Sequence, residues 1–130
     1  MISLLGAAHA LEKRWEEALA QVGLSAPKYG VMTYLVEAGE PLSLSQIAER
    51  MTCVRSNVTQ LIDRLEAEGL VQRVEDPNDR RAVRAALTPL GVKQQAAGRV
   101  EVEKVQKEIS KTLAGVDQRA LIHALEAIKR

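Results

Sequence analysis

The stretch that decides the fold is residues 43–87, which read SLSQIAERMTCVRSNVTQLIDRLEAEGLVQRVEDPNDRRAVRAAL. It opens with Ser43 and, three residues later, Gln46, the Ser-x-x-Gln spacing of a helix capping box. Apolar residues then recur at helical spacing in two runs, separated by a break at Thr52 and Cys53, and the second run ends at Gly69. We therefore predict two short helices joined by a tight turn. Their expected inward residues are Leu44, Ile47, Ala48 and Met51, then Val58, Leu61, Ile62 and Leu65.

After Gly69 the pattern changes to two short apolar segments, residues 70–74 and 82–87. Residues 75–81 between them contain Asp-Pro-Asn-Asp, which is strong turn chemistry. This predicts a two-stranded hairpin with a charged tip. Two helices, a tight turn and a hairpin in this order are typical of a winged helix-turn-helix. The expected fold class is therefore mainly α with a small β-hairpin wing.

Helices are also expected on both sides of this stretch, because apolar residues recur there at helical spacing. The expected helix starts are capped by Ser25, Thr88 and Asp117, and the expected stops are Gly23, Gly39 and Gly115. In the helix after Ser25 we expect Tyr29, Met32, Leu35 and Val36 to point inward. The domain organisation predicted is a winged helix-turn-helix over about residues 25–88, flanked by helical segments at 1–23 and 89–130.

Composition sets limits on the function. The 130 residues are 46% hydrophobic and 27% charged, which argues against a disordered chain, and the core lacks Phe altogether. The net charge is 18 minus 17, or +1, so binding to nucleic acid must be argued from where the charges lie. One cysteine excludes an internal disulfide, and neither a signal peptide nor a membrane span is expected. We expect a cytoplasmic protein.

The outer face of the second helix carries amides, hydroxyls and guanidinium groups, which read base edges or hold phosphates. These residues are Arg55, Ser56, Asn57, Thr59, Gln60, Asp63 and Arg64. The hairpin adds Arg80 and Arg81 at its tip and Arg84 on the return strand, and a narrow minor groove attracts arginines on such a projection. The pattern indicates double-stranded DNA as the partner.

Three segments resemble the MarR family of bacterial transcription regulators, and the resemblance covers essentially the whole chain. They are residues 44–50 (LSQIAER), 57–71 (NVTQLIDRLEAEGLV), and the wing with the start of the next helix, 76–91. Asp79, Arg81 and Arg84 match the Asp-x-Arg-x-x-Arg pattern of the family wing. The resemblance implies a homodimeric DNA-binding regulator, usually a repressor, often released by a small ligand or by oxidation. It departs at Val54, where a Ser or Asp cap is common, so Thr52 is expected to cap the helix instead.

The full set of expected DNA-binding residues joins the helix, the wing and the capping serine. It comprises Ser43, Arg55, Ser56, Asn57, Thr59, Gln60, Arg64, Asp79, Arg80, Arg81 and Arg84. For a small aromatic or phenolic effector, which the resemblance implies, the candidates by position are Trp15, Tyr29, Met32 and Tyr34. These four could equally be ordinary core or interface residues.

The terminal helices carry more apolar surface than one small winged domain can cover. The helix after Thr88 is expected to run about 25 residues, or ~37 Å. A second copy covering Leu4, Leu11, Leu121, Leu125 and Ile128 explains this surface, and the alternative is a long helix folded back on its own domain. Twofold symmetry would place two reading helices about one DNA turn apart.

Other sites are weakly indicated. Cys53 falls at the turn between the two helices, where a buried structural role is expected and a redox sensor is the alternative. His9 and His123 have no second His or Cys at ligand spacing, so neither a metal nor another cofactor is expected. No catalytic constellation is present in the sequence, which argues against an enzyme. The alternative to a DNA-binding repressor is a winged-helix dimer that has lost DNA binding and serves as a protein-interaction module.

Overall fold

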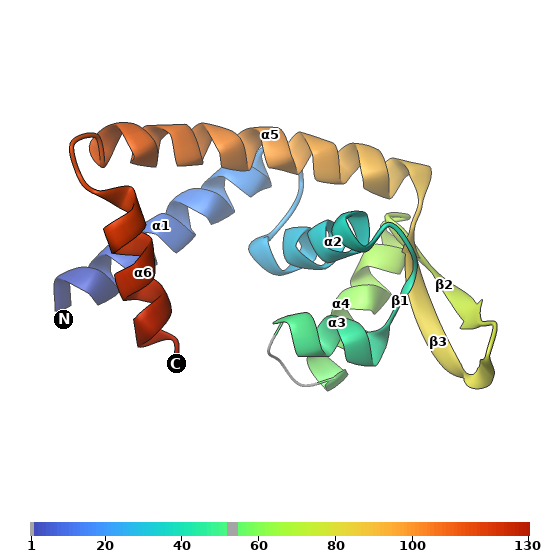
Figure 1. The fold of residues 1–130 in the computed structure, drawn as a ribbon. Helices are drawn as coiled ribbons and strands as arrows, with labels where there is room; N and C mark the ends of the chain where they lie inside the picture. Colours follow the sequence, from blue (N-terminus) through green and yellow to red (C-terminus); the bar gives the residue numbers. More distant parts are fainter. Residues whose placement is uncertain (1, 52–54) are drawn as a thin grey trace.

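The computed structural model describes residues 2–51 and 55–130. In chain order the elements are α1 (Ile2–Ala20), α2 (Ala26–Ala38), β1 (Leu42–Ser43), α3 (Leu44–Met51), α4 (Arg55–Ala67), β2 (Val71–Asp76), β3 (Asp79–Leu87), α5 (Pro89–Thr112) and α6 (Gln118–Ile128). Figure 1 shows α2, α3, α4 and the three strands gathered at one end of the long helix α5, with α1 and α6 toward its other end. The predicted class, mainly α with a small β wing, is confirmed.

The helix starts follow the predicted caps. Ser25 Oγ accepts a hydrogen bond from the Lys28 N–H, Thr88 Oγ1 from the Gly91 N–H, and Asp117 Oδ1 from the Ala120 N–H. Each bond satisfies one of the N–H groups that the first helical turn leaves unpaired. Gly39 ends α2 with φ 67°, a left-handed conformation that favours glycine. Local capping chemistry therefore sets these boundaries.

The sheet differs from the prediction in two ways. It has three antiparallel strands in the order β1-β3-β2, because Leu42 and Ser43 pair with Ala85 and Arg84. The strands also run closer to the tip than expected, leaving only Pro77 and Asn78 between β2 and β3. Two carboxylates make this possible: Asp76 Oδ1 accepts from the Asn78 N–H at 2.8 Å, and Asp79 Oδ1 from the Arg81 N–H at 2.9 Å.

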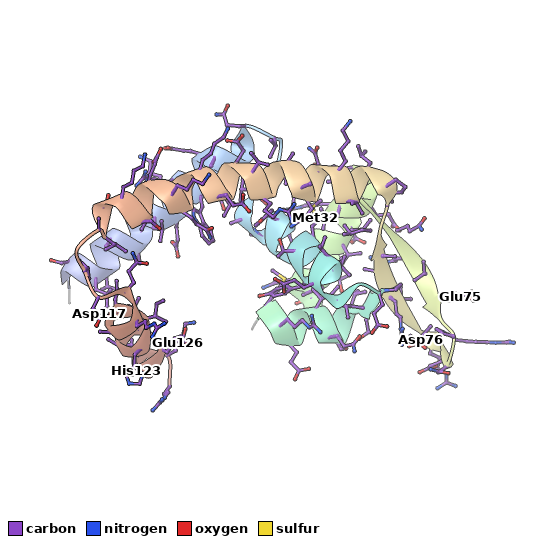
Figure 2. All side chains as sticks on the ribbon, turned by 45° about the horizontal axis from the view of Figure 1, so that its top comes forward. Met32, Glu75, Asp76, Asp117, His123 and Glu126 are labelled. Atoms are coloured by element: carbon purple, nitrogen blue, oxygen red, sulfur yellow. The ribbon has the colours of Figure 1, made fainter. Side chains whose placement is uncertain are left out.

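The core lies where α2, α3, α4 and the sheet meet. Leu19, Val31, Met32, Ile47, Val58, Ile62, Leu65 and Ala85 have no exposed surface. Of the residues expected to point inward, Val36 is wrong, since it is 39% exposed, and Leu61 and Met51 are only half-buried. Met32, labelled in Figure 2, belongs to this core.

Two glycines let α5 approach the winged-helix part closely. A Cβ on Gly91 would overlap the carbonyl oxygen of Leu70, and a Cβ on Gly98 would lie 2.9 Å from Tyr29 Cδ1. Beside Gly91, the Thr88 N–H donates to Leu70 O at 3.1 Å and Thr88 Oγ1 donates to Gly69 O at 2.6 Å. The start of α5 is therefore fixed directly to the turn between α4 and β2.

The far half of the molecule is built differently. Helix α1 packs along α5, where Arg14 pairs with Glu108, whereas α6 has no buried residue and hangs from the end of α5 away from the strands (Figure 1). Apolar side chains are left open on these helices and on the connection between α5 and α6: Leu4, Leu5, Val100, Val116, Ile122, Leu125 and Ile128 are between 37% and 66% exposed. The 24 residues of α5 span about 36 Å.

Candidate nucleic-acid interface

The candidate interface begins with helix α3, which supports α4. Its start is the predicted capping box: the Gln46 N–H donates to Ser43 Oγ at 3.1 Å, and the Ser43 N–H donates to Gln46 Oε1 at 2.9 Å. Ser43 Oγ therefore caps a helix, which uses one of its two acceptor positions. Buried Leu44, Ile47 and Ala48 hold α3 against the core.

Helix α4 presents a polar face because its apolar residues face inward. Val58, Ile62 and Leu65 have no exposed surface, whereas Ser56, Asn57, Gln60 and Arg64 are exposed and Thr59 is half-buried. We call Asn57, Gln60 and Arg64 the reading stripe, since their spacing of three and four residues places them along one side of the helix. Together with Pro27, Met51 and Leu61, they line an open hollow of about 330 Å³.

Some of the residues predicted to cap α4 or to contact DNA are not described by the structure. Thr52, Cys53 and Val54 are outside the described residues, and so is the side chain of Arg55. The predictions that Thr52 caps α4, that Cys53 is buried and that Arg55 contacts DNA accordingly remain predictions.

The wing, residues 71–87, divides its charged residues into two groups. Arg80 and Arg81 are exposed at the tip, and their guanidinium groups form no ion pair with the described residues. Arg84 is instead directed into the hairpin, where its Nε lies 3.2 Å from Asp76 Oδ2 and both side chains are partly buried. Glu75 and Asp76 are labelled beside the tip in Figure 2. Asp79 accepts the Arg81 N–H, so Asp79 and Arg84 both stabilise the turn that carries Arg80 and Arg81.

The electrostatics of Asp76 follow from this geometry. Its pKa is lowered, first by the hydrogen bond that its carboxylate accepts from the Asn78 N–H and then by the guanidinium of Arg84. The carboxylate is therefore ionised under ordinary conditions. It closes the turn and holds the return strand at the same time.

One charged residue of this region was missed by the sequence reasoning. Arg73, on β2, pairs with Asp63 and Glu66 of α4. The signal was available, since Asp63 and Glu66 are three residues apart and share a helix face, and an arginine follows in the next strand. The sequence alone does not give the angle at which β2 leaves the turn after α4, and that angle decides whether Arg73 reaches these two carboxylates.

Of the four effector candidates, Met32 belongs to the core, and Trp15, Tyr29 and Tyr34 pack against that core. Met32 is fully buried in the core, Tyr34 donates its hydroxyl proton to Arg50 O at 3.1 Å, and Tyr29 packs against Gly98. Trp15 lines a separate hollow of about 310 Å³ between α1 and α5, formed with Leu11, Gln106, Ile109 and Ser110. Its Nε1 is buried and has no acceptor among the described residues.

No group of three His, Cys, Asp or Glu side chains in the described part of the chain could hold a metal ion. None of the described helices is long and apolar enough to span a membrane.

The chain was compared with known proteins. The sequence model of the MarR family matches residues 24–83. The uncharacterised helix-turn-helix transcriptional regulator YsmB of Bacillus subtilis is 35% identical over 89 residues, which is 68% of this chain and 60% of YsmB. Other curated relatives are covered over only 42% to 66% of their own length.

Two solved structures share the fold over nearly the whole chain. The transcriptional repressor CouR of Rhodococcus jostii, solved bound to a 23-mer DNA duplex, is 26% identical with a TM-score of 0.89, over 98% of this chain and 90% of CouR. AbsC of Streptomyces coelicolor, described as a MarR family transcriptional regulator, is 27% identical with a TM-score of 0.88, over 98% of this chain and 87% of AbsC.

Proposed function

The chain belongs to the MarR family through its winged-helix region, and from this premise we propose that it is a sequence-specific DNA-binding transcriptional regulator. The observation that carries the proposal is the combination of the reading stripe on α4 with Arg80 and Arg81, two exposed cations at the wing tip that have no ion pair among the described residues. Amides on a helix reach base edges in a major groove, while arginines on a projection suit the adjacent minor groove. Helix α4 would be the recognition helix.

The remaining predicted DNA contacts enter the proposal with different roles. Ser56, Thr59 and Arg55 lie on the same helix as the reading stripe and would add contacts to bases or phosphates. Ser43, Asp79 and Arg84 are occupied in caps and ion pairs, so their main contribution would be to hold the contacting groups in place.

We further propose that the protein acts as a homodimer through residues 1–23 and 89–130. Helix α6 buries none of its residues, and the apolar side chains of α1, α5 and α6 need a cover that this chain does not provide. A twofold axis through these helices would set two recognition helices about one helical turn, or ~34 Å, apart on a pseudo-palindromic site. Such a regulator would work in the cytoplasm.

The finer part of the proposal is repression. CouR, at 26% identity, is described as a transcriptional repressor and was solved on DNA, which supports the same direction of action for this chain. Release by a small aromatic or phenolic molecule would use Trp15, Tyr29, Met32 and Tyr34, of which Trp15 lines the hollow between α1 and α5.

The test is selection of a binding site from random DNA, followed by binding measurements on the selected and a scrambled duplex over a salt series. The proposal expects an inverted repeat with half-sites about 10 base pairs apart, and affinity that falls steeply with salt. The pair of variants is Gln60→Ala on α4 and Glu37→Ala on the exposed side of α2, of which only the first should weaken binding. Absence of any selected sequence would favour the protein-interaction module instead.

A further inference from the structure

Arg73 joins the wing to the recognition helix through three hydrogen bonds. Its Nη2 donates to Asp63 Oδ1 at 2.5 Å, its Nη1 donates to Glu66 Oε1 at 2.7 Å, and its main-chain N–H donates to Glu66 Oε2 at 3.1 Å. Two of the donors lie on the planar guanidinium, so the orientation of the side chain is fixed by two carboxylates at once. We call Arg73, Asp63 and Glu66 the clamp.

The clamp is placed where it controls geometry. Asp63 and Glu66 lie in the second half of α4, on either side of Arg64 of the reading stripe, and Arg73 lies in β2 opposite the fully buried Ala85. Ala85 also pairs with Leu42 of β1, so Arg73 lies opposite a residue of β3 that is paired on both sides. The clamp therefore joins the helix to the base of the hairpin rather than to its tip.

The charge of Arg73 is already compensated. Its side chain is 28% exposed and faces two carboxylates, and its pKa is raised, chiefly by the hydrogen bond to Asp63, with burial opposing and Glu66 adding. Because its guanidinium is already paired with two carboxylates, Arg73 is poorly suited to bind a phosphate. Arg64, Arg80 and Arg81 are different, because none of them has an ion pair within the described part of the chain.

We propose that Arg73 is a positioning residue, which holds the recognition helix and the wing at one fixed angle so that both fit the same DNA duplex. The proposal rests on the DNA-binding function above. In this proposal Arg73 contributes to sequence discrimination and does not contact phosphate. With the clamp open, the recognition helix and the wing could each still touch DNA, but they would no longer fit the same duplex at the same time.

The experiment measures one quantity, the affinity for the selected duplex divided by the affinity for scrambled DNA. For Arg73→Gln, which stays polar but is shorter and loses the cation, this ratio should fall about tenfold or more, as it does when one base-pair contact is lost. A variant that is merely less folded loses both affinities by the same factor, because the folded fraction multiplies both, and its ratio stays constant. Arg73→Lys should restore part of the ratio, since an ammonium group reaches one carboxylate but not both.

Two further variants separate positioning from direct contact. Asp63→Asn with Glu66→Gln leaves Arg73 in place but opens the clamp, so the ratio should fall although the surface has become more positive. If Arg73 instead contacts phosphate, the same double variant should bind all DNA more tightly, with an unchanged ratio and a steeper salt slope. Glu37→Gln neutralises an exposed carboxylate of α2, outside the proposed dimer segments, and should leave the ratio unchanged.

The outcomes are distinct for the two proposals. If the unmodified protein selects no sequence, the DNA-binding function and the role of Arg73 both fall. If it selects a sequence and Arg73→Gln keeps the ratio of the unmodified protein, the function stands and the positioning role is refuted.

Discussion

The close approach at Gly91 gives a stability prediction whose size follows from the structure. A Cβ there would overlap Leu70 O and lie 3.0 Å from both the Leu70 carbonyl carbon and Leu87 Cδ2. Because two of these atoms belong to a nearly buried main chain, Gly91→Ala must push α5 away from the hairpin. Overpacking of this kind costs about 1–3 kcal/mol.

The displacement would also break the bond from the Thr88 N–H to Leu70 O, leaving a carbonyl unsatisfied at a cost of about 1–3 kcal/mol. Alanine returns about 1 kcal/mol of helix propensity. We therefore expect a net loss of about 3 kcal/mol in the free energy of unfolding, and a Tm lower by roughly 10–15 °C in a domain of this size.

The assay is denaturant unfolding followed by circular dichroism at one protomer concentration, since dimerisation makes stability depend on concentration. The matched control is Gly30→Ala in α2, where a Cβ would make an ordinary contact 4.0 Å from Met51 Cε and stability should hold or rise by up to about 1 kcal/mol. Equal stability of Gly91→Ala and the unmodified protein would refute the reasoning.

Three other outcomes are expected. Gln60→Ala should cost about 1–3 kcal/mol of binding free energy on the selected site and relax the preference at particular base pairs. Arg81→Ala should weaken binding to all sequences and lower the salt slope by about 1 per arm. Binding of both variants to both duplexes over a salt series checks this, and an unchanged slope for Arg81→Ala would contradict it. Leu125→Glu should produce monomers or aggregates, because the charge would be buried against an apolar partner; light scattering decides, and an unmodified protein that is monomeric at micromolar concentration would exclude the dimer. The lowered pKa of Asp76 means that its folded form binds a proton less readily than its unfolded form, so its contribution to stability is present above about pH 4 and is lost as the pH falls further. Asp76→Asn should therefore lose stability at neutral pH and show less acid dependence than the unmodified protein in pH-dependent unfolding, and parallel acid profiles would count against this role.

Features fixed by near neighbours in the chain could be predicted from the sequence. Ser25, Thr88 and Asp117 cap helices because their side chains reach main-chain N–H groups three residues on, and the Ser43–Gln46 box works in the same way. The exposed position of Asn57 and Gln60 followed from helical periodicity alone.

Features that depend on strand register could not be predicted. Arg84 was expected to face DNA, but its ion pair with Asp76 requires knowing that β3 pairs with β2 across an irregularity between Glu75 and Asp76. Strand β1 escaped prediction because two residues are too few to show alternation. Val36 failed for a related reason: the end of α2 lies beside an open hollow with Pro41 and Val92, which only the tertiary fold reveals.

Ser43 has a consequence for protein engineering. It ends β1, where it pairs with Arg84, and it also caps α3, so one residue serves both the sheet and the helix pair. If DNA specificity were exchanged between relatives by transferring α4 alone, α4 would be separated from the supporting helix α3 and from β1, whose Ser43 caps α3. The smallest transferable cassette is therefore residues 42–88, which carries the β1 edge, both helices, the hairpin and the threonine that starts α5.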